Sequence, residues 1–147
     1  MEAELGSFTA TTQILQNLNT KYKYLDNIYN LTRDMEAVVI SGDVRAFGKL
    51  LDMRGDLIIM VDDIDQANFD IARRLPSPLR ERIEGILMPK KDYSGETMTL
   101  ENPLETNIYD TNKRISTLLG KIIKLDQEIN HKVNASKRSS SRPIIRA

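Results

Sequence analysis

The sequence predicts an all-α protein: an antiparallel helical bundle or coiled-coil hairpin with three long helices and one short helix. Apolar residues recur at helical spacing through most of the 147 residues, which include only 7 glycines and 5 prolines. Hydrophobic residues make up 40% of the chain and charged residues 29%, a balance typical of folded proteins. The length suits one core, so we expect a single domain over residues 1–135.

The first long helix is expected to begin between residues 7 and 20 and to end near Ile40. Its apolar stripe comprises Leu25, Ile28, Leu31, Met35, Val38 and Val39, with Ile14, Leu18 and Tyr22 as extensions. Gly42 can then adopt the left-handed conformation that ends a helix, and Asp43 can accept from the free amides of the next one. This pattern predicts a sharp turn between two antiparallel helices.

The second long helix is expected over residues 43–74. Its broad apolar arc contains Phe47, Leu50, Leu51, Leu57, Ile58, Val61, Ile64 and Phe69. Arg54 and Asp65 fall near the centre of this arc but lie about 16 Å apart along the helix, so they cannot pair with each other. Each therefore needs a partner on another helix or must extend to the edge of the bundle. Asp126, inside the apolar arc of the last helix, is the expected partner of Arg54.

A short helix is expected over residues 78–88. Two prolines end the preceding helix, and Ser77 with Pro78 forms a suitable cap and first helical residue. Residues 89–101 show no helical period and are predicted to form a loop.

The last long helix is expected over residues 103–135. Its start is marked by Asn102 as the cap, Pro103 at the first helical position and Glu105 as the reciprocal acid. Steps of three, four and seven residues then hold one apolar face, typical of coiled-coil packing: Leu104, Ile108, Ile115, Leu118, Ile122, Leu125, Ile129 and Val133. Residues 136–147 have low complexity and a basic charge, so we expect a disordered tail.

The last helix is apolar over more surface than one partner helix requires. Leu119 and Ile123 extend its apolar surface sideways by roughly 100° from Ile122. Either the short helix covers this shoulder, or the shoulder docks a helix of another protein. The candidate protein-binding residues are Ile115, Leu118, Leu119, Ile122, Ile123 and Ile129.

Catalytic and metal-binding patterns are absent from the sequence. The chain has no cysteine and one histidine, His131, too few ligands for an ordinary zinc site. Asp62, Asp63 and Asp65 lie close together, but their surroundings fit neither a calcium-binding loop nor an Asp-Asp-x-x-Asp motif. No phosphate-binding glycine loop or nucleophile motif occurs, so we expect no enzyme activity, no cofactor and no metal.

The charges are divided unevenly along a chain of zero net charge. Residues 134–147 contain four basic residues and no acid, which leaves 17 basic and 21 acidic residues, a charge of −4, in the rest. Four basic residues are weak evidence for binding of nucleic acid or anionic lipid. We interpret the tail as a disordered end that keeps the protein soluble. The first residues lack a signal-peptide pattern, and the longest apolar run has five residues against about 20 for a bilayer span. We therefore expect a cytoplasmic protein with no nucleic-acid partner and no stable membrane insertion.

The turn and the second helix resemble a known family. The residues that carry the resemblance are Ser41-Gly42-Asp43-Val44, Phe47, Leu50-Leu51, Arg54, Leu57-Ile58, Ile64 and Asp65, with a looser match at Ile122, Leu125-Asp126 and Glu128-Ile129. They resemble the FlgN-like family of flagellar type III export chaperones. The resemblance implies a helical cytoplasmic chaperone without ATPase activity. Its client would be the amphipathic C-terminal segment of a hook-filament junction (hook-associated) protein, bound largely by the C-terminal helical region, kept export-competent and passed to the flagellar export apparatus.

Other functions satisfy the same pattern. The chaperones of the filament cap protein are equally helical, and a generic helical interaction or scaffold bundle would show the same periodicity. The sequence also leaves open a monomer or a homodimer, because a four-helix monomer and an open coiled-coil dimer share one pattern.

Overall fold

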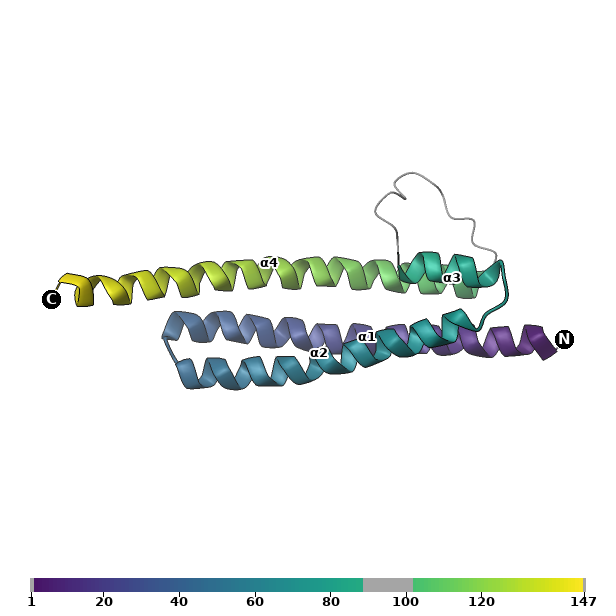
Figure 1. Ribbon diagram of the computed structural model, residues 1–147, viewed down its shortest axis with the longest axis horizontal. Coiled ribbons are helices and arrows are strands. Elements are labelled where there is room, and N and C mark those ends of the chain that lie inside the picture. The colour runs from purple at the N-terminus through teal and green to yellow at the C-terminus, as the bar shows by residue number, and fades with distance from the viewer. Residues whose placement is uncertain (1, 89–101, 147) are drawn as a thin grey trace, which may run out of the picture.

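The computed structural model describes residues 2–88 and 102–146, and this part of the chain is all-α (Figure 1). The helices are α1 (Glu2–Ser41), α2 (Val44–Arg73), α3 (Leu79–Leu87) and α4 (Pro103–Arg146). The predicted fold class, with three long helices and one short one, is confirmed. Residues 89–101, predicted to form a loop, lie outside the described residues.

The turn between α1 and α2 forms as its sequence predicts. Gly42 has a φ of 78°, and its amide donates to the carbonyl of Val38 at 3.0 Å. The Asp43 side chain accepts from the amide of Ala46 at 3.0 Å and caps α2. α1 begins earlier than the expected range of 7–20, at Glu2. Its first residues, Glu-Ala-Glu-Leu, are strong helix formers that extend the helix without a recognisable apolar stripe.

The start of α3 differs from the prediction. The helix begins at Leu79, and Ser77 makes no capping bond to a backbone amide. Its hydroxyl instead donates to the Glu81 carboxylate and accepts from Arg80, each at 3.3 Å. Side-chain partners one turn further along the chain therefore take the place of the expected cap.

The start of α4 agrees with the prediction in its main feature. The Asn102 side chain accepts from the amide of Glu105 at 2.9 Å. The return bond differs, because the Glu105 carboxylate accepts from the side-chain amide of Asn102 and not from its backbone. The far end differs more: α4 continues through residues 136–146, where the sequence predicts the disordered tail 136–147. That prediction rested on composition, but the segment holds no glycine, and no residue before Pro143 in it breaks a backbone helix.

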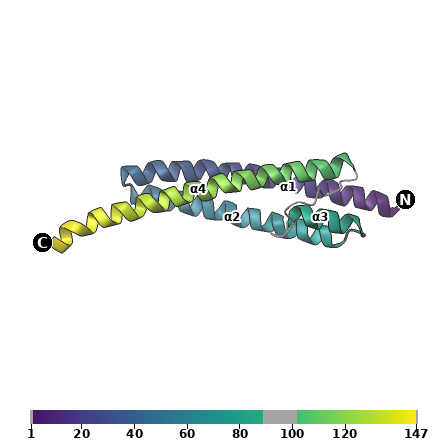
Figure 2. The same cartoon turned by 90° about the horizontal axis from the view of Figure 1, so that it is seen from above.

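The helices form an incomplete four-helix arrangement. α1 packs against both α2 and α4, and α3 packs against α2 and α4 at the end of the bundle that holds the N-terminus (Figures 1 and 2). Figure 1 shows α4 extending past the turn between α1 and α2 at the other end. The buried core runs along α1 and is completed from the other helices; its larger apolar members are Ile14, Leu18, Leu25, Ile28, Val61, Leu75, Ile83, Ile86, Ile108, Ile115, Leu118 and Ile122. Within the described residues, no Cα atom of α2 lies within 8 Å of a Cα atom of α4.

Candidate functional site

An open groove separates α2 from α4 because α3 is short. α3 has 9 residues, whereas α2 has 30, so α3 fills the space between the two long helices at one end only. Its polar contacts with α4 include the Arg82–Glu105 ion pair and a bond from the Asn112 side chain to the Ile86 carbonyl at 2.8 Å. Positions 105, 112, 119 and 126 are seven residues apart and share one face of α4. The face that α3 covers at its beginning therefore continues uncovered through Leu119 and Asp126.

The groove has a volume of about 300 Å³, with α1 as its floor and α2 and α4 as its walls. Its lining residues are Lys21, Leu25 and Ile28 of α1, Arg54, Ile58, Val61, Asp62 and Asp65 of α2, and Leu119, Ile122 and Asp126 of α4. Ile58 is 43% exposed, and Ile123, one turn after Leu119, is 56% exposed. Apolar side chains therefore stand uncovered on both walls.

Arg54 connects the two walls, as the sequence predicts. Its guanidinium donates to the Asp126 carboxylate at 2.5 Å and to the Thr32 hydroxyl of α1 at 3.3 Å. Thr32 is fully buried, and its own hydroxyl donates to the Ile28 carbonyl at 2.6 Å. One arginine therefore joins three helices across the groove, and the predicted pairing of Arg54 with Asp126 is confirmed.

Asp65 also has the partner on another helix that its position requires. Lys21 of α1 donates to it at 2.7 Å, and the Lys21 side chain is only 11% exposed. This lysine is not among the residues predicted from the sequence. A signal was present, because Ile14, Lys21, Ile28 and Met35 follow one another at seven-residue steps. A lysine at a core position of that series indicates a buried partner.

The structure separates the six predicted binding residues into two groups. Ile115, Leu118, Ile122 and Ile129 are buried in the bundle, so only Ile122 also reaches the groove, from its inner side. Leu119 is half-buried and lines the groove, while Ile123 is exposed beside it. The polar contacts of α3 with α4 lie at Glu105 and Asn112, before the shoulder, and α3 leaves Ile123 uncovered.

The α2 wall is the part of the site that was not predicted from the sequence. Leu51 and Ile58 belong to the broad apolar arc of α2, yet each is 43% exposed. α2 packs against α1 along one side, and this side is narrower than the arc. The sequence held a signal for this wall, because the apolar arc of α2 is wider than its contact with one partner helix. The same kind of excess pointed to Leu119 and Ile123 on the last helix.

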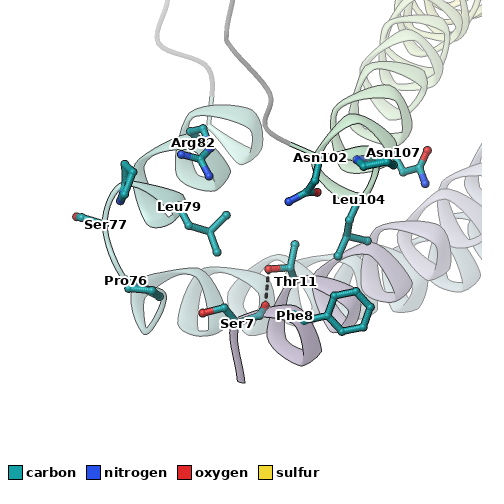
Figure 3. A pocket seen from close by; sticks show the side chains of 12 residues that line it. Ser7, Phe8, Thr11, Pro76, Ser77, Leu79, Arg82, Asn102, Leu104 and Asn107 are labelled. Carbon is teal, nitrogen blue, oxygen red and sulfur yellow. Dashed lines mark hydrogen bonds between the residues drawn. The ribbon is translucent and has the colours of Figure 1, made fainter. Parts of the chain in front are cut away.

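A second and larger depression, of about 900 Å³, lies at the end of the bundle (Figure 3). Leu79 of α3 and Leu104 of α4 extend toward its centre, and Thr11 of α1 lies between them (Figure 3). Two of its polar side chains are engaged with the bundle itself, since Arg82 and Asn102 both donate to the buried Glu105 carboxylate. We attribute this depression to the ends of helices that diverge, and we regard the groove between α2 and α4 as the candidate site.

The described part of the chain shows neither a metal site nor a membrane span. Over residues 2–88 and 102–146, no three His, Asp or Glu side chains gather where they could hold a metal ion. No helix in these same ranges combines the length and apolarity that a bilayer span requires.

Comparisons of the chain with protein-family models, curated proteins and solved structures gave no match. Its function is therefore inferred from the geometry of the groove and from the resemblance carried by the sequence.

Proposed function

We propose that this protein is a chaperone-type binding protein that holds an amphipathic helix of another protein in the groove between α2 and α4. The observation that carries the proposal is that the fourth helix position of the bundle, the space between α2 and α4, is filled only in part. α3 occupies this position at one end, and the remaining length exposes Ile58 in the groove, Leu51 two turns before it on α2, and Ile123 beside the α4 wall. A helix with an apolar stripe would continue the packing of α3 and cover these side chains.

The affinity of such a complex would be modest. Burying an aliphatic side chain that is already half covered contributes about 1 kcal/mol, so a handful of them supply several kcal/mol. A client segment that folds on binding loses about 2–5 kcal/mol of this to its own ordering. We therefore expect a Kd on the order of micromolar and a negative heat-capacity change from the burial of apolar surface.

The resemblance to the FlgN-like family supports a specific client. We propose the amphipathic C-terminal segment of a hook-filament junction protein, held in the cytoplasm and passed to the flagellar export apparatus without any enzyme activity. The alternatives are the filament cap protein as client, or a generic helical scaffold whose partner is another coiled coil.

Titration calorimetry with the C-terminal segment of a hook-filament junction protein tests the proposal. Ile58→Asp and Ile123→Asp place a charge on each wall of the groove, and each should weaken binding at least tenfold, because a carboxylate would be desolvated on binding. Both side chains are already exposed, so thermal unfolding should stay near that of the wild type.

Met60→Asp is the matched control. Met60 is 47% exposed, close to Ile58, but two residues further along α2 it faces a different side. Its substitution should leave binding unchanged. Equal affinity of Ile58→Asp, Ile123→Asp and wild type would refute the groove as the binding site. Binding of a cap-protein segment but not of the junction segment would replace the client, and binding of neither would leave the scaffold function.

A further inference from the structure

The α2 wall of the groove has an acidic outer edge. Asp62 lines the groove, and Asp52, Asp56, Asp63 and Asp70 lie further round the same helix. All five are exposed, and within the described residues none takes part in an ion pair.

No base on this stretch of α2 balances these charges. Between residues 52 and 70 the only basic residue is Arg54, which is paired with Asp126 across the groove. The α4 wall is different in kind. Beyond Ile123, the part of α4 nearest the groove continues with Gln127 and Asn130, which carry no charge, and the bases Lys113 and Lys124 lie further round the helix. The groove is therefore bordered by acids on the α2 side, and on the α4 side by neutral polar residues with bases further round.

We propose that the helix that occupies the groove is amphipathic with a row of lysine or arginine on the flank that faces α2, and with uncharged polar residues on the flank that faces α4. This inference rests on the proposed function and adds the charge of the client. A set of exposed aspartates without ion pairs in the described part of the chain, beside an apolar groove, favours a basic partner and disfavours an acidic one.

Two synthetic peptides of about three heptads, roughly 21 residues, test the inference. Both carry leucine along one stripe and glutamine on one flank; the other flank is lysine in one peptide and glutamate in the other. Fluorescence anisotropy of labelled peptides against the full chain should show the lysine peptide binding about tenfold more tightly at low salt. The difference should shrink at 1 M salt, where charges are screened within about 3 Å.

Charge reversal on the protein gives the decisive comparison. Asp52→Lys/Asp62→Lys should remove or invert the preference for the lysine peptide. Asp26→Lys/Asp34→Lys, which makes the same charge change on the exposed face of α1, should leave most of it in place. Equal binding of the two peptides by the wild type would overturn the inference. So would an equal loss of preference in both double variants, because that would reflect net charge alone.

Failure of this inference is distinguishable from failure of the proposed function. If both peptides bind equally and Ile58→Asp weakens both, the groove holds a helix but does not select its charge. If Ile58→Asp weakens neither, the groove is not the binding site and both proposals fall. Light scattering identifies a further refuting outcome: a wild-type dimer that Ile58→Asp converts to monomers would make a second copy the occupant.

Discussion

Replacing Arg82 with methionine should destabilise the protein far more than removing an arginine from its surface. The Glu105 carboxylate is 0% exposed and accepts from the Arg82 guanidinium at 2.6 and 3.4 Å and from the Asn102 amide at 2.9 Å. Arg82→Met would leave a buried carboxylate with one neutral donor. Breaking a buried pair in this way typically costs about 3–5 kcal/mol. Because the Arg82 side chain is 20% exposed, water can reach the site, and we expect about 3 kcal/mol.

Urea unfolding followed by far-UV circular dichroism measures this cost by linear extrapolation. Arg80→Met is the control on the same helix. Arg80 meets Glu84 at 4.0 Å and the Ser77 hydroxyl at 3.3 Å, both on the surface, so its loss should cost less than about 0.5 kcal/mol. The double variant Arg82→Met/Glu105→Leu removes both charges and should recover most of the lost stability. The reasoning is refuted if Arg82→Met is no less stable than Arg80→Met, or if the double variant is as unstable as Arg82→Met alone.

Three other sites give predictions from local geometry. A double-mutant cycle of Arg54→Ala and Asp126→Ala, measured by urea unfolding, should give a coupling of about 0.5–1 kcal/mol, discounted because Asp126 is partly exposed; less than about 0.3 kcal/mol would contradict the bridge. Gly42→Ala should cost about 1 kcal/mol in thermal unfolding because φ is 78° there, and an unchanged midpoint would show that the turn adapts. Asn102→Ala should cost about 1–2 kcal/mol, since it removes both the cap of α4 and a donor to Glu105; a stability equal to wild type would show that water replaces both.

The sequence predicts the parts of the fold that depend on local rules. The glycine and aspartate of the turn have conformational and capping preferences that need no knowledge of the rest of the chain. The pairing of Arg54 with Asp126 follows from a similar principle, because charges inside apolar arcs need partners and few partners were available. In each case the alternative structure, a turn without these residues' preferred conformations or a buried charge without a partner, is strongly unfavourable.

The remaining features depend on which of several possible contacts forms in the folded chain, and the spacing of residue types along the sequence does not show this. Ser77 could cap a helix or meet Glu81, and the surroundings of both groups decide between these options. The length of α3 relative to α2 sets how much of the groove stays open. The apolar arcs therefore predict excess surface at Leu119 and Ile123 of α4 but not the exposed part of α2. The composition of residues 136–147 likewise indicates that little apolar surface is available there, and says less about the backbone, which continues α4 to Arg146.

The central place of α1 has a consequence for how this chain can change over generations. Along its inner stripe, side chains such as Ile28 lie where α2 and α4 both pack, so one altered side chain disturbs two interfaces together. Residues on the outer surfaces of α2 and α4 affect one interface or none. Exposed side chains at the groove, such as Ile58 and Ile123, can therefore change while α1 keeps the bundle folded, so in the proposed function the choice of client can evolve apart from the fold.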